Sequence, residues 1–194
     1  HSDAHQYYSQ ALQICIQTDD RYGEGMAYNN LGIIADVLGH YEEARQYYEQ
    51  GLEIMRKTGG RQGEGVVLAS FGLLLVHAGD PDSARALSEQ ALEIADELGE
   101  QRVAGYALTN LGHALTLLNR PAEALAAYHR AVVIRQDLGD QVVALESQAG
   151  EIRALIALER LDEARPLVEN ILKHLEIGSL DGVEEPGRVY LTIF

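Results

Sequence analysis

Apolar residues recur along the chain at spacings of three and four, as in Leu31, Ile34 and Leu38. This spacing places them on one face of an α-helix and does not fit the alternation of a β-strand. Residue types that tolerate the left-handed conformation follow the apolar segments and mark the helix ends: Gly39, Gly59, Gly79, Gly99, Asn119 and Gly139. The pattern therefore predicts helices at about 3–18, 22–38, 42–58, 62–78, 82–98, 102–118, 122–138, 142–158 and 162–177.

An internal repeat organises these helices. A shift of 40 residues superposes segment 21–32 on 61–72 and on 101–112, and a fourth copy begins at Gln141. Each copy holds two helices, and one pair alone cannot bury both of its apolar faces, so the pairs must stack. We expect an all-α, right-handed solenoid: a partial unit at about 1–20, units at 21–60, 61–100, 101–140 and 141–180, and the start of a truncated unit at 181–194.

Repeated columns indicate how the helices pack. The columns are the glycines Gly32, Gly72 and Gly112, the large apolar residues Leu31, Phe71 and Leu111, and the tyrosines Tyr8, Tyr48 and Tyr128. The glycines let helices approach closely, and we interpret the tyrosines as packing residues and not as stacking platforms for bases. The fourth copy departs from this pattern, because Glu151 and Ile152 stand where Leu-Gly is expected and Gly150 is displaced. We expect its packing to differ.

The ends of the chain give a further expectation. Residues 178–187 are predicted to form a loop, and residues 188–194 the beginning of another helix. The chain thus starts within a second helix and stops within a first helix. We expect it to be a piece of a longer array, in which exposed ends of the truncated array allow self-association.

Charge narrows the range of partners. Fifteen Lys and Arg face thirty Asp and Glu, so the net charge is −15, which repels the phosphates of nucleic acids and anionic membranes. We therefore expect neither nucleic acid nor membrane as a partner. The single Cys15 forms no internal disulfide, and neither a membrane-spanning run nor a signal-peptide pattern is present, so the predicted compartment is the cytoplasm.

No residue pattern typical of catalysis or of a cofactor is found. The pairs Gly23/Gly25 and Gly63/Gly65 lie at predicted helix starts, without the preceding strand or the following Lys-Ser/Thr of a phosphate-binding loop. His77 and His113 fall on neighbouring first helices and lack a positioned third ligand, so no metal site is expected. We predict that the chain is not an enzyme and binds no cofactor.

The columns Leu31-Gly32, Gly39, Ala44, Tyr48 and Gly51, repeated along nearly the whole chain, resemble the tetratricopeptide repeat. The period of 40 exceeds the family's usual 34, and the proline that closes the second helix is absent; both features are similar to the kinesin light-chain-like subgroup. The resemblance implies a protein-binding or peptide-binding module.

In this family the first helix of each pair lines a concave groove. The residues that match this wall are Met26, Asn29, Asn30, Ile33, Val37, Val66, Ser70, Leu73, His77, Tyr106, Thr109, Asn110 and His113. We expect Asn30, Ser70 and Asn110 to hydrogen-bond the backbone of an extended peptide. The alternative is that some of these side chains pack against neighbouring helices or satisfy their own backbone. The acidic residues fall mostly on second helices, where a solvated convex face is expected.

A finer resemblance concerns the segment from Gly182 to Leu191, which is similar to a linker late in the repeat arrays of bacterial STAND signal-transduction ATPases and related multidomain regulators. It implies that the array is the ligand-sensing arm of such a protein. The alternative is a constitutive assembly scaffold with no switching role. The sequence identifies neither the ligand nor the oligomeric state.

Overall fold

The computed structural model describes residues 2–177, and within them every regular element is a helix. The helices are α1 (Ser2–Thr18), α2 (Arg21–Val37), α3 (Tyr41–Thr58), α4 (Arg61–His77), α5 (Pro81–Leu98), α6 (Gln101–Leu117), α7 (Pro121–Asp137), α8 (Gln141–Ala157) and α9 (Leu161–Ile177). The predicted all-α fold is confirmed, with helix ends within about one residue of those expected. The predicted loop 178–187 and helix start 188–194 lie outside the described residues.

The helix ends form as their residue types require. Gly59 and Gly99, which follow α3 and α5, have φ values of +69° and +72°, in the left-handed region that suits glycine. Asn119 and Glu159 take the same conformation without being glycine. At helix starts, the carboxylates of Asp20 and Asp80 accept hydrogen bonds from the backbone N–H of Gly23 (2.8 Å) and of Ser83 (3.2 Å).

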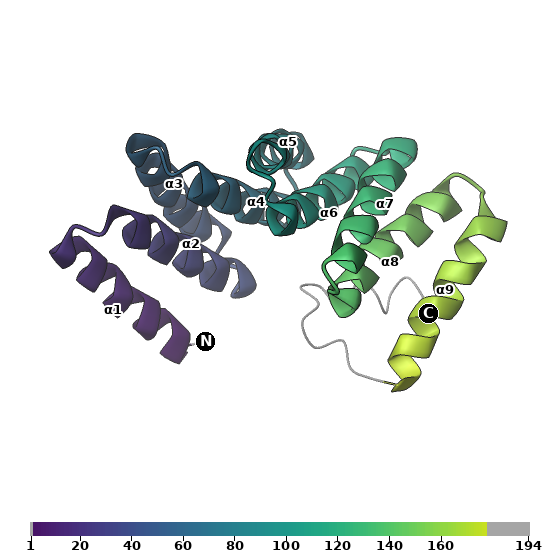
Figure 1. Cartoon of the computed structure of the whole chain (residues 1–194), viewed down its shortest axis with the longest axis horizontal. Coiled ribbons are helices and arrows are strands. Elements are labelled where there is room, and N and C mark those ends of the chain that lie inside the picture. Colours follow the sequence, from purple (N-terminus) through teal and green to yellow (C-terminus); the bar gives the residue numbers. More distant parts are fainter. Residues whose placement is uncertain (1, 178–194) are drawn as a thin grey trace. The chain divides into compact units, whose positions relative to one another are not determined.

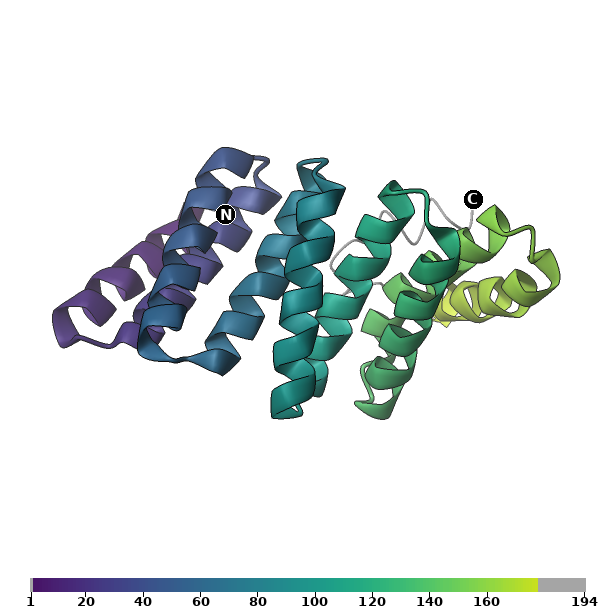
Figure 2. The same ribbon diagram turned by 90° about the horizontal axis from the view of Figure 1, so that it is seen from above.

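The helices form two compact units, residues 1–103 and residues 104–194. Unit 1 contains α1 to α5 and the first residues of α6; the described part of unit 2 contains the rest of α6 with α7, α8 and α9. Within each unit, consecutive helices are antiparallel neighbours joined by short turns (Figure 1). In unit 1, α3 and α5 lie on one side, with α2 and α4 behind them (Figure 2).

The core of unit 1 is built around Tyr48 of α3. A Cβ atom added at Gly32 of α2 would stand 2.8 Å from the Tyr48 ring, so the glycine permits the close approach of α2 to α3. Phe71 of α4 also contacts Tyr48, and the two rings stack with their centroids 5.5 Å apart. The guanidinium of Arg45 covers Phe71 at 5.8 Å. Burying a side chain of this size contributes about 1.5–3 kcal/mol, so this column links the first two repeats.

Unit 2 uses its tyrosine differently. Gly112 of α6 lies against Tyr128 of α7, as Gly32 lies against Tyr48, but Gly150 of α8 lies against the same ring from another helix. A Cβ atom at Gly150 would be within 2.4 Å of the ring, so α8 packs closely on α7. The displaced glycine of the fourth copy, Gly150, therefore packs against a tyrosine of the preceding helix, Tyr128 of α7, whereas Gly32 and Gly112 pack against a tyrosine of the following helix. Helices α8 and α9 pack against each other through a separate apolar cluster: Leu145, Ala149, Ile152, Leu155, Ala164 and Ile171.

Candidate functional site

Most of the predicted groove positions that are exposed or half-buried lie on α2 and α4 of unit 1, two neighbouring helices. They share one helical side of α2 (Met26, Asn30, Ile33, Val37) and of α4 (Val66, Ser70, Leu73, His77), here called the α2/α4 face. Ile33 is 41% exposed and Val37 63%, while the others are half-buried. The face thus offers apolar side chains and uncharged hydrogen-bonding groups to solvent.

A polar contact fixes the spacing of these two helices. His77 Nδ1 of α4 lies 2.9 Å from Asp36 Oδ1 and 3.1 Å from Oδ2, and the Asp36 carboxylate is almost fully buried. The ring of Tyr41, at the start of α3, packs near His77 with centroids 6.5 Å apart. His77 therefore links α4 to α2 through Asp36 at one end of the α2/α4 face, a contact that the sequence did not suggest.

The hydrogen-bonding groups of the face are partly used within their own helices. Ser70 Oγ donates to the Val66 carbonyl at 3.2 Å, and Asn29 Nδ2 lies 3.5 Å from Asn30 Oδ1. Of the expected ladder, Asn30 and Ser70 remain half-buried side chains of this face. The Asn30 amide can still donate through its own Nδ2 group to a peptide carbonyl.

Four of the predicted groove residues are buried in the structure: Asn29, Thr109, Asn110 and His113. In unit 2 the Thr109 hydroxyl lies 2.9 Å from Ser147 Oγ of α8, and its Oγ1 donates to the Gly105 carbonyl. His113 Nδ1 lies 2.7 Å from the Tyr128 hydroxyl. Thr109 and His113 therefore join α6 to α8 and α7 and are buried away from any ligand.

The remaining α6 candidate, Tyr106, also has an internal partner. The guanidinium of Arg135 lies over its ring, 4.4 Å from the centroid, and Arg135 is buried. Such a cation–π contact in a desolvated position is worth about 2 kcal/mol. Tyr106 is half-buried and packs against α7, so it is better explained as an interhelical contact than as a groove residue.

Sequence reasoning missed a polar cluster on α8. Four consecutive or nearby polar side chains of this helix are buried: Glu146, Ser147, Gln148 and Glu151. Glu146 Oε1 lies 3.3 Å from His113 Nε2, and Gln148 Oε1 accepts a bond of 2.9 Å from Asn170 Nδ2 of α9. A signal was available: Glu151 stands in the column of Leu31 and Phe71, which are buried.

Glu151 lies on the wall of a cleft of about 610 Å³ between α7, α8 and α9. Its carboxylate accepts a 2.7 Å hydrogen bond from Nδ1 of His129, whose side chain is 70% exposed. Burial raises the pKa of Glu151, and the His129 contact only partly offsets this. Apolar side chains, including Leu125, Val132 and Leu155, form much of the remaining wall.

A buried carboxylate of unit 1 behaves in the opposite way. Burial alone raises the pKa of Glu64, but hydrogen bonds from Arg56 (2.9 Å) and Arg61 (2.8 Å) outweigh it, so that pKa lies below its usual range. Two guanidinium groups therefore neutralise Glu64, whereas Glu151 has one imidazole. The two sites differ in how fully the buried charge is compensated.

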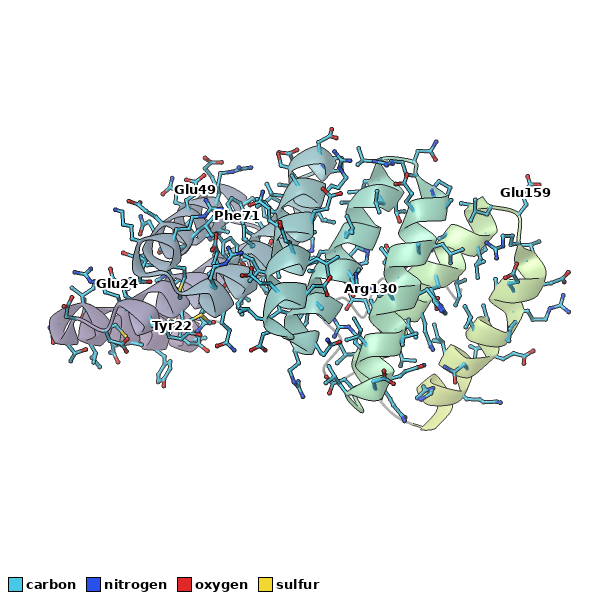
Figure 3. The ribbon with its side chains drawn as sticks, turned by 45° about the horizontal axis from the view of Figure 1, so that its top comes forward. Tyr22, Glu24, Glu49, Phe71, Arg130 and Glu159 are labelled. Carbon is cyan, nitrogen blue, oxygen red and sulfur yellow. The ribbon has the colours of Figure 1, made fainter. Side chains whose placement is uncertain are left out.

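The acidic residues of the second helices are exposed as predicted: Glu42, Glu43, Glu49, Glu53, Glu89, Glu93 and Glu97. Figure 3 shows Glu49 on the outer side of α3. Arg61 links α4 to this surface through a 2.8 Å bond to Glu97. The expectation of a solvated acidic surface on α3 and α5 is confirmed.

The residues that the structure describes show few features typical of a metal site or of a reactive side chain. Among residues 2–177 no three His, Cys, Asp or Glu side chains are arranged to hold a metal ion. Burial, with Asp20 and Glu24 nearby, raises the pKa of the Cys15 thiol, which disfavours the reactive thiolate. None of the described helices combines the length and apolar character needed to cross a membrane.

Comparison with known proteins agrees with this architecture. The family model described as tetratricopeptide repeat matches residues 1–57 and 65–137. No curated protein sequence matches the chain. Among solved structures, BtubC (BKLC) from P. vanneervenii is similar, with a TM-score of 0.76 and 18% identity over 87% of this chain and 70% of that one.

Two structures of a putative kinesin light chain from Podosopora anserina, with nearly identical TPR-like repeats, are also similar. The Q17M form has a TM-score of 0.67, and the other form 0.65. Each is 20% identical over 87% of this chain, and the matched parts are 84% and 83% of those chains. At such identities the likeness concerns the fold.

Proposed function

Because the chain belongs to the tetratricopeptide repeat family, we propose that it binds an extended segment of a protein partner on the α2/α4 face. Repeats of this family imply a protein-binding module, and proteins built from them are generally scaffolds without catalytic activity. The α2/α4 face is the part of the predicted groove whose side chains remain accessible, and it is the position that the proposal assigns to the peptide.

Exposure of Ile33 and Val37 carries this proposal. Both lie on α2, and large exposed apolar side chains beside uncharged polar groups are a feature of peptide-recognition surfaces. Leu73 of α4 adds an apolar group, and the Asn30 amide can hydrogen-bond a peptide backbone whatever its side chains. Affinity on this face should come from apolar burial and backbone hydrogen bonds.

In the intact protein, we propose, the array is the ligand-sensing arm of a larger signal-transduction ATPase or transcriptional regulator. Support comes from the resemblance of the segment from Gly182 to Leu191 to the linker of such arrays. Switching then requires that the ligand bind one state of the parent more tightly than the other, because equal affinity shifts no equilibrium. A ligand that binds without changing ATPase activity or assembly would leave a constitutive scaffold as the function.

Selection of peptides from a displayed random library on the wild-type chain tests the binding site. Ile33→Asp and Leu73→Asp introduce a charge on the α2/α4 face and should each weaken a selected peptide at least about tenfold, since they abolish apolar contact. Glu49→Gln changes an exposed charge on α3 and should leave affinity unchanged. Binding should also depend weakly on salt.

Selected peptides that bind the Ile33→Asp and Leu73→Asp chains as tightly as wild type would place the site elsewhere. Loss of binding with added salt would indicate the acidic surface of α3 and α5 instead.

A further inference from the structure

We propose that the cleft between α7, α8 and α9 is a second recognition site, which takes a lysine side chain of a protein segment, flanked by apolar residues, onto the Glu151 carboxylate. This site lies in unit 2 and is separate from the α2/α4 face of unit 1. The inference does not depend on peptide binding at that face.

The cleft lies where the fourth copy of the repeat has Glu151 in place of a large apolar residue. Phe71 of α4 and Glu151 of α8 occupy equivalent positions, two repeats apart. In unit 1 the Phe71 ring stacks on Tyr48 and is covered by Arg45; Figure 3 labels its position on α4. In unit 2 the equivalents are a carboxylate, Tyr128 and Leu125, so a charged group faces an apolar cleft.

The charges on the cleft wall favour a cationic ligand. Arg160, in the turn before α9, and Glu163 of α9 also line the cleft, but they pair with each other through two contacts of 2.7 Å and so neutralise each other. The uncompensated charge of the wall is that of Glu151, and its neighbour His129 is an exposed imidazole. Glu64 of unit 1 indicates what such a buried carboxylate accepts when partners are available, namely two cationic side chains.

The shape of the cleft selects a long apolar stem. Leu125, Val132, Leu155 and Leu167 line it, and its volume of about 610 Å³ exceeds what a single aminoalkyl chain would fill. A lysine presents an ammonium on four methylenes and can bury this stem along apolar surface. Neighbouring apolar residues of the same segment would occupy the rest. The His129 bond uses Oε1, and a carboxylate has a second oxygen that can accept from the ammonium.

The test uses two acetylated and amidated peptides of leucine and alanine that differ at one central residue. One carries lysine, and the other carries norleucine, which keeps the aliphatic stem and lacks the ammonium. NMR titration of the wild-type chain with the lysine peptide should shift the methyl signals of Ala126, Leu155 and Leu167. The norleucine peptide should bind at least about tenfold more weakly.

Variants assign the effect to the carboxylate. Glu151→Gln keeps the size of the side chain and the oxygen that accepts from His129. It should weaken binding of the lysine peptide at least about tenfold and leave the affinity for the norleucine peptide unchanged. Glu151→Phe restores the residue of unit 1 and should abolish binding of both peptides at the cleft. Glu49→Gln removes an exposed carboxylate of unit 1 and should change neither affinity. Circular dichroism and thermal unfolding establish that each variant is folded.

Several results would overturn the proposal. Equal binding of the two peptides, an unchanged affinity in Glu151→Gln, or the absence of cleft shifts at millimolar peptide would each do so. Binding of n-hexylamine as tight as that of the lysine peptide would make the ligand a small amine and not a protein segment. Because the peptides are read out in unit 2 and the Ile33 and Leu73 variants lie in unit 1, failure here is distinguishable from failure of the α2/α4 face.

Discussion

Helices α4 and α8 occupy the same place in the repeat, yet at three equivalent positions they bury opposite kinds of side chain. Where α4 buries Val67, Leu68 and Phe71, α8 buries Ser147, Gln148 and Glu151. Both helices remain regular over 17 residues. The helical repeat therefore tolerates exchange of its apolar core positions for polar ones when each polar group has a nearby partner.

A contact present in both units explains why polar residues are tolerated in α8. Each retains a fully buried tyrosine, Tyr48 or Tyr128, against which a glycine of the preceding helix packs. Unit 2 adds Gly150 on the same ring, so α8 is held through α7. The tyrosine contacts set the architecture, and the polar positions of α8 change the chemistry of unit 2 within it.

The largest expected effect comes from removing that tyrosine. Tyr128→Ala should destabilise the chain by about 3–5 kcal/mol, since it leaves a large cavity between α6, α7 and α8. Tyr48→Ala should cost a similar amount in unit 1. Denaturant unfolding followed by circular dichroism measures the loss, and hydrogen exchange locates it. A cost below about 1 kcal/mol for Tyr128→Ala would mean that the ring does not organise unit 2.

The second effect separates the two glycine contacts. Gly150→Ala places a methyl group against the Tyr128 ring and should cost about 1–3 kcal/mol, more than the helix propensity that alanine gains. The matched control is Gly105→Ala in α6, where the nearest side-chain atom would be 3.5 Å away, an ordinary contact. That control should be neutral or stabilising by up to about 1 kcal/mol. Equal losses in the two variants would refute close packing of α8 on α7.

The sequence predicted the helices and repeat well because both depend on local, repeated signals. Gly59 and Gly99 end helices through their own backbone conformation, and Tyr48 recurs in register with the glycines that receive it. Of the predicted groove positions, those that remain accessible lie mostly on α2 and α4. Burial of Thr109 and His113 depends on partners supplied by other helices, Ser147 and Tyr128, which no local pattern reveals.

Glu151 is a second residue whose contacts could not be predicted from local sequence. Its departure from the column of Phe71 is visible in the sequence, but the cleft and the His129 contact arise only when α7, α8 and α9 come together. The departure from the repeat therefore identified Glu151 as an unusual position, and the packing of α7, α8 and α9 determines its environment.

The smallest expected effect is the pH dependence of Glu151. Because its pKa is raised in the folded chain, the folded state binds this proton more readily than the unfolded state, so stability falls as the pH rises from the ordinary carboxyl range through the raised value. His129 of α7 faces the carboxyl, and the pair formed by Arg160, which precedes α9, and Glu163 of α9 lines the same cleft. Glu151→Gln should therefore stabilise the chain at neutral pH, with a gain that disappears below the ordinary carboxyl pKa.

Thermal unfolding of wild type and Glu151→Gln across this pH range makes the measurement. A gain that persists at low pH would show that the glutamine acts through packing and not through the charge. Glu49→Gln, at an exposed position, should show no such pH-dependent difference.

The most direct measurement is the free energy of unfolding of the double variant Gln148→Leu/Glu151→Phe, which gives α8 the residues of α4. If the polar residues of α8 serve recognition at the expense of stability, this chain should be more stable than wild type by about 1–4 kcal/mol, because buried polar groups replaced by apolar ones of suitable shape relieve desolvation. The former partners, Asn170 and His129, are half-buried and exposed, so water can satisfy them. A double variant less stable than wild type would contradict this account and make the polar cluster of α8 a structural element of unit 2.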